Sequence, residues 1–386
     1  MLVFTLVAAI FLVVVALCTQ DIAHELRAPH LVAILSDPTT GPLVTVIIPA
    51  RNEASRIAAC LNGLASQHYR SFEVIVVDDH STDETGEIAR GFAARLPMLE
   101  VINGAELPAD WAGKCWACWQ AATQARGEWL LFLDADVVPL PGLVGALVAR
   151  ATSSQLDAIT LMPLQHFGTP AERLLIPAFQ TIMYGVYPLH EVSDPHKQPA
   201  FFNGQAILIS RAVYTASGGH AAVRDSVLED ADFGARVKAA GYRILAAHAH
   251  TLLTVRMYDN WPSVCEGLGK NAVAGYRSGG WRSGWVGFRQ SLIGYAWLYL
   301  LGSGAAWWLT SRTPIGLVVA LHGLVLLAIT LGTTTWLFHR RYRASPLLAL
   351  GYPIGLGLYY ALALNGLFRV KSGLGVTWKG RVLSGK

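Results

Sequence analysis

Charged residues are scarce in this chain. Of its 386 residues, 15% are charged and 53% are hydrophobic. That balance excludes an ordinary water-soluble enzyme. The net charge is only +4 and no dense basic stripe occurs, so no nucleic-acid partner is expected. Internal repeats and low-complexity tracts are also missing, which argues against a repeat architecture.

Cysteines are few, and their spacing is irregular. The five are Cys18, Cys60, Cys115, Cys118 and Cys265. An odd, scattered set excludes a disulfide framework. Cys115-x-x-Cys118 has neither a second pair nor a histidine cluster to complete a zinc site. We therefore expect reduced, structural thiols in a cytoplasmic domain.

What the chain does have is long apolar runs at both ends. They cover residues 2–18, 291–309, 314–338 and 346–368. Each is near the ~20 residues needed to cross a bilayer. The first lacks the basic start and the cleavage site of a signal peptide. A buried helical bundle is the alternative for the other three, but three runs so close together favour membrane helices.

Basic residues beside these runs predict the orientation. Arg277, Arg282 and Arg289 precede the second run, and residues 339–343 separate the third from the fourth. The positive-inside rule puts both clusters, and the central domain before them, on the cytoplasmic side. We expect an integral protein of the inner (cytoplasmic) membrane.

The C-terminal tail conflicts with that topology. Three full spans after a cytoplasmic domain would leave the tail outside, although it carries Lys371, Lys379, Arg381 and Lys386. The fourth run contains Pro353 near its middle. Our hypothesis is that this run is kinked or re-entrant and returns the tail to the cytoplasm.

The middle of the chain has a globular pattern. It predicts strands at 43–48, 72–77, 99–101, 129–133 and 206–210, and helices at 54–66, 82–94, 117–125 and 231–240. Ser81 or Thr82 is expected to cap the second helix, and Gly241 to end the last. Strands that alternate with helices predict an α/β fold with a parallel sheet, whose ligands bind at the carboxyl ends of the strands.

Acidic residues stand at those strand ends. Asp134-Ala-Asp136 follows the 129–133 strand, Asp78-Asp79 follows the 72–77 strand, and Glu229-Asp230 precedes a helix. Paired carboxylates at a strand end provide hard oxygen ligands for a divalent cation that binds a diphosphate.

With Pro49-Ala-Arg-Asn52-Glu53, these motifs resemble in order and spacing the inverting family 2 glycosyltransferases of the GT-A fold. The resemblance covers residues 43–255 and includes Asn203-Gly-Gln205 and Gly218-Gly219. Leu107 to Ala117, with Trp111 and Lys114, is similar to the subgroup that acts on membrane isoprenoids, the hopene-associated and carotenoid (diaponeurosporenoate-type) enzymes.

The resemblance implies a domain plan. It has an N-terminal transmembrane helix at 1–20, a Rossmann-like GT-A nucleotide-sugar-binding domain at 40–255 and transmembrane helices at 291–370. Between the last two lies an interfacial region at 256–290, rich in aromatic and basic residues, for which an ordinary linker is the alternative. A tail at 371–386 follows.

The resemblance also implies roles for the motif residues. Glu53 and Asp79 would contact the nucleoside, Pro49 would also belong to the donor-binding site, and Lys114 and Arg256 would contact the diphosphate. Asp136 would bind Mg²⁺ or Mn²⁺, with Asp134 assisting toward the metal or the ribose. Asp79 could instead be a helix-terminal carboxylate and Lys114 a surface lysine.

A base is also required, because the acceptor hydroxyl must lose its proton. Asp230 matches the family's base, and Glu229 would orient the acceptor or tune Asp230. The alternative is that both residues cap the helix that begins near Ala231. The expected outcome is inversion at the anomeric carbon.

One motif of the family is missing. Processive synthases carry Gln-x-x-Arg-Trp after the base, and this chain has only Arg256-Met-Tyr258 and Asn260-Trp261. Transfer of a single sugar is therefore expected. The tail segment from Val376 to Arg381 resembles a recurring C-terminal segment of these enzymes, which contacts the donor or headgroups.

The predicted function is a glycosyltransferase that uses a nucleotide sugar, with UDP expected and GDP the alternative. The predicted acceptor is an isoprenoid, hopanoid, carotenoid or glycerolipid from the membrane, with no obligate protein partner. The alternatives are a polyprenyl-phosphate glycosyltransferase, which would need Asp230 less, and a non-catalytic membrane protein that binds nucleotide sugars.

Overall fold

The structure is a computed structural model that describes residues 2–226, 228–372, 374–378 and 381–383. Its contacts group the chain into two compact units. The α/β unit comprises Ala28–His166 and Tyr187–Met257, and the helical unit comprises Met1–Arg27, Phe167–Val186 and Tyr258–Lys386. Residues 167–186 fall inside the predicted domain of 40–255, but they group with the helical unit.

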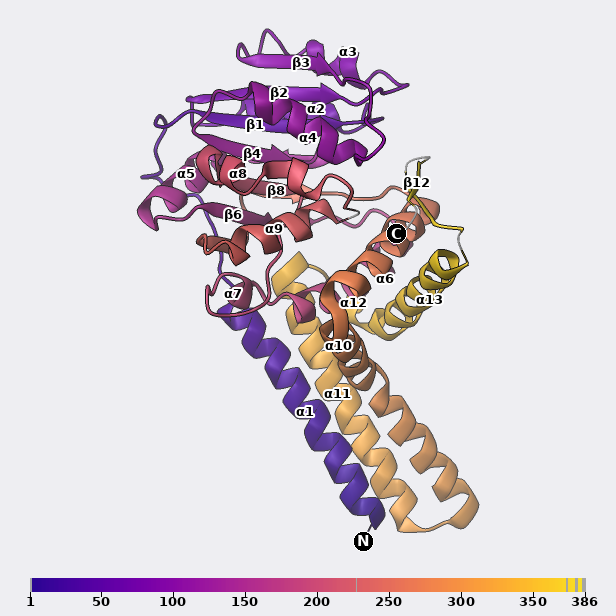
Figure 1. Ribbon diagram of the computed structural model, residues 1–386. Helices are drawn as coiled ribbons and strands as arrows, with labels where there is room; N and C mark the ends of the chain where they lie inside the picture. Colours follow the sequence, from indigo (N-terminus) through magenta and orange to yellow (C-terminus); the bar gives the residue numbers. More distant parts are fainter. Residues whose placement is uncertain (1, 227, 373, 379–380, 384–386) are drawn as a thin grey trace. The chain divides into compact units, whose positions relative to one another are not determined.

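The α/β unit is built on a mixed sheet with the strand order β3-β2-β1-β4-β8-β6-β9 (Figure 1). These strands are β1 (Val44–Ala50), β2 (Phe72–Asp78), β3 (Leu99–Asn103), β4 (Trp129–Leu133), β6 (Ala158–Met162), β8 (Ala206–Ser210) and β9 (Ile244–His248). β1, β2, β3 and β4 pair in parallel with one another, whereas β8 runs antiparallel to both β4 and β6. The prediction of a parallel sheet therefore holds for only part of it.

The strand order reverses between β1 and β4. From β1 the chain moves outward to β2 and β3, and then returns to the other side of β1 as β4. The side chains of β1 and β4 are almost entirely buried, so both strands run through the core. Open α/β sheets bind ligands beyond the carboxyl ends of their strands at such a reversal. The ends of β1 and β4 are therefore where a site is expected.

Shorter elements complete the α/β unit. Its helices are α2 (Ile57–Ala65), α3 (Thr85–Arg90), α4 (Gly113–Gln124), α5 (Leu143–Ser153), α7 (Leu189–Val192), α8 (Arg211–Ala216), η1 (Gly219–Val223) and α9 (Glu229–Ala239). A smaller sheet contains β5 (Val137–Pro139), β7 (Leu164–Gln165) and β10 (Leu253–Val255). The sequence pattern did not predict α5, β6 or the smaller sheet.

The predicted cap of α3 is wrong. Its N-cap is Glu84, which makes no side-chain capping hydrogen bond. Ser81 Oγ instead accepts from the Asn52 amide at 3.0 Å, and the Thr82 amide donates to Asn52 Oδ1 at 2.8 Å. These bonds tie the loops after β1 and β2 together. The predicted stop of α9 is correct, because Gly241 has a φ of 87° just beyond the helix.

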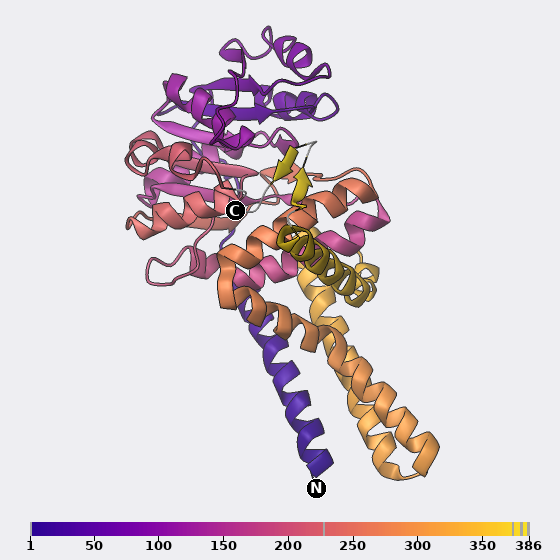
Figure 2. The ribbon, with the colours of Figure 1, turned by 45° about the vertical axis from the view of Figure 1, so that its right-hand side comes forward.

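The helical unit contains α1 (Leu2–Arg27), α6 (Pro170–Val186), α10 (Trp261–Ser311), α11 (Pro314–Tyr342), α12 (Leu347–Leu350), α13 (Tyr352–Lys371), β11 (Val376–Trp378) and β12 (Arg381–Leu383). Within the described residues, three helical segments are long and apolar enough to cross a membrane: α1, Gly280–Ser311 of α10, and α11. Figure 2 shows the second part of α10 and α11 as an antiparallel pair. Apolar side chains of α1, α10 and α11 form a shared cluster.

The last two predicted segments differ from their expected form. The run 346–368 is divided between α12 and α13 and is not among the three candidate spans. The expected interfacial region 256–290 is largely helical and continuous with the second span, with a bend at Gly280, whose φ is 53°. The side chains of Tyr276, Arg277, Trp378 and Arg381, and all of Lys379, Gly380 and Lys386, lie outside the described residues.

Buried ion pairs join the ends of the long helices. Arg341 Nε of α11 donates to Glu25 Oε2 of α1 at 2.6 Å, and Arg289 of α10 pairs with Asp21 of α1. All four residues are under 9% exposed. The Arg341 guanidinium also lies over the ring of Tyr184, 4.5 Å from its centroid. Each buried acid is thus matched by its own arginine.

Candidate active site

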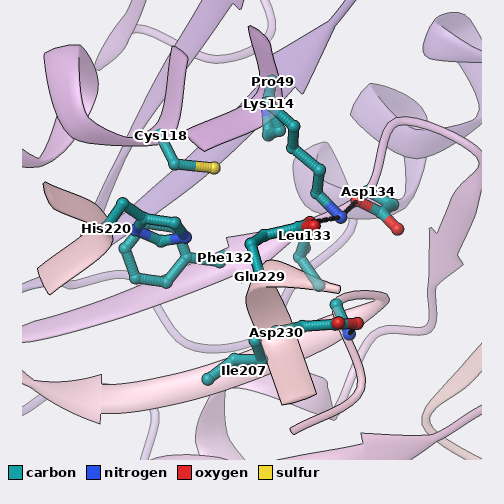
Figure 3. A pocket seen from close by; sticks show the side chains of 11 residues that line it. Pro49, Lys114, Cys118, Phe132, Leu133, Asp134, Ile207, His220, Glu229 and Asp230 are labelled. Carbon is teal, nitrogen blue, oxygen red and sulfur yellow. Dashed lines mark hydrogen bonds and ion pairs between the residues drawn. The ribbon is translucent and has the colours of Figure 1, made fainter. Parts of the chain in front are cut away.

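One lysine of the α/β unit lies among carboxylates at the strand reversal. Lys114 Nζ is 2.8 Å from Asp134 Oδ1 and 3.2 Å from Glu229 Oε1 (Figure 3). Asp230 and Pro49 line the same pocket. The structure therefore brings together Pro49, Lys114, Asp134, Glu229 and Asp230, all of them predicted site residues.

Secondary structure fixes each of these side chains. Asp134 directly follows β4, and Lys114 is the second residue of α4. Glu229 and Asp230 occupy the first turn of α9, where the exposed amides of a helix favour negative charge. Leu228, the N-cap, supplies no capping side chain. The two acids are thus the first two residues of the helix, and neither of them is its N-cap.

Asp230 is held in one orientation by two backbone amides. Its Oδ2 accepts from the Gly204 amide at 2.7 Å, and its Oδ1 accepts from the Ala231 amide at 2.8 Å. A β-carbon on Gly204 would come within 2.7 Å of Lys114 Nζ and 2.9 Å of Asp230 Oδ2. A side chain at position 204 would therefore displace the lysine or the carboxylate.

The charges of this cluster perturb one another. Burial, and then the neighbouring Glu229 carboxylate, raise the pKa of Asp230 to about 6. Lys114 and the two amide hydrogen bonds act in the opposite direction. Burial alone would lower the pKa of Lys114, but Asp134, Glu229 and Asp230 together raise it well above its usual value. Lys114 is therefore charged, and Asp230 titrates near neutrality, as a general base requires.

A buried histidine in the pocket wall escaped prediction. His220 Nδ1 lies 3.0 Å from Tyr214 Oη, and its ring packs 4.8 Å from that of Phe132. Burial lowers the pKa of His220 to about 4, so the imidazole is neutral. The only sequence signal was its position directly after Gly218-Gly219. The Cys118 thiol lies in the same wall, and burial raises its pKa, as expected for an inert structural thiol.

Glu53 and Asp79, which were predicted to contact the nucleoside, lie in the loops after β1 and β2. Glu53 and Asp79 are 7% and 6% exposed. The Glu53 amide donates to Thr85 Oγ1 at 2.7 Å, and Arg51 Nη1 donates to the Asp79 carbonyl at 3.0 Å. Neither carboxylate lines the pocket around Lys114. The structure therefore places them in the adjoining loops.

Asp136 and Arg256 lie at the same end of the smaller sheet. In the smaller sheet Val137 of β5 pairs with Val255 of β10 in antiparallel register. Asp136 directly precedes β5 and Arg256 directly follows β10, so the antiparallel register puts both residues beside this pair. Neither lines the pocket around Lys114.

The chemistry of Asp134 and Asp136 suits a divalent cation. Both supply carboxylate oxygens, the ligands that Mg²⁺ and Mn²⁺ prefer. Within the described residues, no histidine, cysteine or further acid converges with them closely enough to form a three-ligand protein site. Magnesium is commonly bound by one or two carboxylates together with substrate phosphates. The residues present fit a cation that shares its ligands with a diphosphate.

Comparisons with known proteins agree with this geometry. Residues 45–231 match the profile of Glycosyl transferase family 2. The chain is 26% identical to the 4,4'-diaponeurosporenoate glycosyltransferase of Staphylococcus aureus (strain MRSA252) over 88% of each chain. It is also 26% identical to the enzyme of that name from Staphylococcus haemolyticus (strain JCSC1435), over 62% of this chain and 63% of the relative.

A solved structure supports the fold. The mannosyltransferase PcManGT from Pyrobaculum calidifontis, in complex with GDP-Man and Mn²⁺, aligns with a TM-score of 0.55 and 18% identity. The alignment covers 93% of this chain and 99% of that one. Residues 45–231 therefore form a domain of glycosyl transferase family 2 with the GT-A fold, and the protein is a glycosyltransferase.

Proposed function

We propose that the protein transfers one sugar from a nucleoside diphosphate sugar to a hydroxyl group of a membrane lipid, with inversion at the anomeric carbon. The observation that carries the proposal is the position of Asp230. Gly204 orients its carboxylate, and it shares a pocket with Lys114 and Asp134 at the strand reversal. A proton acceptor and a phosphate-binding cation are thus a few ångströms apart.

The donor would lie along the carboxyl ends of β1, β2 and β4. Glu53 and Asp79 would hold the nucleoside, with Pro49 below it, and Lys114 and Arg256 would face the diphosphate. Asp136 and Asp134 would hold Mg²⁺ or Mn²⁺, which neutralises charge on the leaving nucleoside diphosphate when bound. UDP is the expected nucleotide, with GDP the alternative.

The acceptor would approach from the side of α9. Its oxygen forms a bond to the anomeric carbon while the bond from that carbon to the diphosphate oxygen breaks, and the electron pair leaves with the diphosphate. The acceptor proton moves to the Asp230 carboxylate. Glu229 would orient the acceptor or tune Asp230. Base catalysis of this kind contributes roughly 10²- to 10⁴-fold.

The acceptor is expected to be an isoprenoid-type lipid. The curated relatives are named for a carotenoid acceptor, which supports an apolar chain here. Hopanoid and glycerolipid acceptors are the alternatives. The presence of a base with a pKa near 6 favours a hydroxyl, because an ionised carboxylate or phosphate has no proton to lose.

The membrane helices support an orientation for the catalytic unit. Among the described residues, one candidate span precedes the α/β unit and two follow it. The α/β unit and the end of α11 then lie on the same side. His339, Arg340 and Arg341 occupy the last turn of α11. The positive-inside rule puts that end, and with it the α/β unit, in the cytoplasm at the inner membrane.

The first test is a donor screen on detergent-purified full-length protein. Release of nucleoside diphosphate would be measured with each sugar donor, host lipid extract and Mn²⁺ or Mg²⁺. Wild type would be compared with Asp230→Asn and with the matched control Asp232→Asn. Asp232 lies in the same helical turn but is exposed and bonded to Ser226.

We expect release from one donor that rises with lipid, falls with Asp230→Asn and is unchanged by Asp232→Asn. Release that depends on lipid but not on Asp230 would indicate that the acceptor is a carboxylate or a polyprenyl phosphate and not a hydroxyl. Release that ignores lipid altogether would overturn the lipid acceptor.

A further inference from the structure

The segment α12–α13 has a continuous apolar face that the protein does not cover. Leu347, Leu350, Ile354, Leu364 and Phe368 are between 58% and 73% exposed. Gly357 and Ala361, the intervening members of the same series, are exposed as well. Steps of three and four residues put all seven on one side of a helical path. Exposed apolar surface of this extent marks an interaction site.

The opposite side of the segment is fixed to the rest of the helical unit. Tyr352 Oη donates to Gln290 Oε1 at 2.8 Å, and Tyr360 Oη donates to the Gly287 carbonyl at 2.6 Å. Tyr295 Oη of α10 donates to the Pro353 carbonyl at 2.7 Å. One side of α13 is therefore held by α10, and only the apolar side remains to be covered.

The direction and the break of this segment argue against a span. Pro353 has no amide hydrogen to donate to the Ala349 carbonyl, so the helix is interrupted between α12 and α13. Figure 1 shows α13 slanting across the direction shared by α1 and α11, which are candidate spans. The segment itself is not among those candidates in the described part of the chain.

Basic residues stand at both ends of the segment. Residues 344–368 contain no charged side chain. Arg340 and Arg343 precede them, and Arg369 and Lys371 follow. A spanning helix would send one basic end across the membrane. A helix in the plane of the membrane keeps both ends at anionic headgroups of one leaflet.

We propose that α12–α13 lies in the plane of the cytoplasmic leaflet, with its apolar face in the acyl chains and its basic ends at the headgroups. The lipid bilayer is what covers the apolar face. The short link 343–346 joins α12 directly to the end of α11, which is a candidate span. The tail after Lys371 then stays on the side of the catalytic unit. The inference goes beyond the proposed sugar transfer and does not depend on the donor or the acceptor.

Depth measurements on the full-length protein test the orientation. Single cysteines at Leu350, Ile354, Ala361 and Leu364 would carry a spin label in a Cys265→Ser background, since the other four cysteines are buried. The protein would be placed in vesicles that contain anionic lipid. Collision with oxygen and with a water-soluble nickel chelate reports depth, and labels at exposed Leu35 and Ser372 give references for water and for the helix end.

We expect all four labels to meet oxygen, to avoid nickel and to lie at about the same depth. From residue 354 to 364 a helix rises about 15 Å. Depths that change progressively over such a distance would show a span and overturn the proposal. Labels shielded from both reagents, with dipolar broadening between copies, would show a dimer interface instead.

A label-free measurement covers the case in which a variant does not fold. Wild-type protein in the same vesicles would be photolabelled with a membrane-dissolved carbene precursor and mapped by mass spectrometry. Labelling of Leu347, Ile354 and Phe368, with little on the buried ring of Tyr359, is expected. An unlabelled apolar face would show that lipid does not cover it.

Discussion

Charges are matched one to one where α1 meets α10 and α11, but not in the pocket around Lys114. Arg341 and Arg289 of the helical unit each face one acid, Glu25 and Asp21. In the α/β unit a single cation, Lys114, is surrounded by Asp134, Glu229 and Asp230. An acid paired with its own arginine needs no further counter-ion. Carboxylates in excess of their cations are fit to bind further positive charge and to accept a proton.

The two groups of charged side chains also differ in how far they are exposed to solvent. The Glu25 and Arg341 side chains are 2% and 5% exposed, whereas those of Asp134 and Lys114 are 29% and 36% exposed. Removing one partner of a fully buried pair leaves an uncompensated charge and costs about 3–5 kcal/mol. The active-site charges retain access to solvent and ligand. Mutations in the two clusters should therefore affect different properties, stability in one and catalysis in the other.

The largest expected effect is on catalysis. Asp230→Asn should lower kcat by roughly 10²- to 10⁴-fold, because the base is lost while the amide oxygen still accepts from Gly204. The thermal unfolding midpoint in detergent and the Kd for nucleoside diphosphate should stay near those of wild type. A large fall in the unfolding midpoint would contradict this assignment, because it would make Asp230 a structural charge.

The second effect is on stability. Arg341→Met should destabilise the protein by about 3–5 kcal/mol, because Glu25 is left buried without its cation. Denaturant unfolding in detergent measures the loss. The double variant Glu25→Gln/Arg341→Met should recover much of it, since no unpaired charge remains. If the double variant is as unstable as the single one, the balance of charge is not what stabilises this region.

The third effect concerns donor binding. Lys114→Met should weaken binding of nucleoside diphosphate by about 10- to 100-fold, the range for a hydrogen bond to a charged group. Calorimetry with and without Mn²⁺ would measure it, with the exposed Lys197→Met as control. Unchanged affinity under both conditions would show that Lys114 neutralises the neighbouring carboxylates and does not contact the diphosphate.

The smallest effect is the pH dependence. Asp230 accepts a proton only when ionised, and its pKa is about 6, so kcat/KM should fall as the pH drops below about 6 and level off above it. Lys114 lowers the pKa of Asp230, so Lys114→Met should move this midpoint to higher pH. A profile that is flat from pH 5 to 8 in both proteins would show that no such base limits the reaction.

The carboxylates of the site were predictable because chain order fixes their place. Asp134 and Asp79 follow strands with strong apolar patterns, and parallel strands bring their carboxyl ends to one edge. Lys114 could be linked to the phosphates through a resemblance and through its place after a glycine and before a predicted helix. Its contacts with Asp134 and Glu229 depend on the packing of α4 and α9, elements that are far apart in the sequence.

Other features had no local signal. His220 is in the pocket wall because Tyr214 and Phe132 enclose its ring, which a sequence pattern does not express. The need for glycine at 204 comes from the approach of Lys114 and Asp230 from two other elements. The run 346–368 reads as a span by hydropathy. Pro353 allowed a kink to be predicted from the sequence, but the division into α12 and α13 and the packing of one side on α10 emerge only in three dimensions.

α6 belongs to the helical unit although it lies between two parts of the α/β unit in the sequence, and this has a practical consequence. The chain passes between the units at residues 27–28, 166–167, 186–187 and 257–258, so a single proteolytic cut does not separate them. A soluble fragment made from residues 28–257 would carry α6 without α10 and α13, on which it packs. Leu175 and Ile176, which are fully buried in the intact protein, would then be left without those helices. Replacing residues 167–186 by a short polar linker is the more promising route to an isolated catalytic domain.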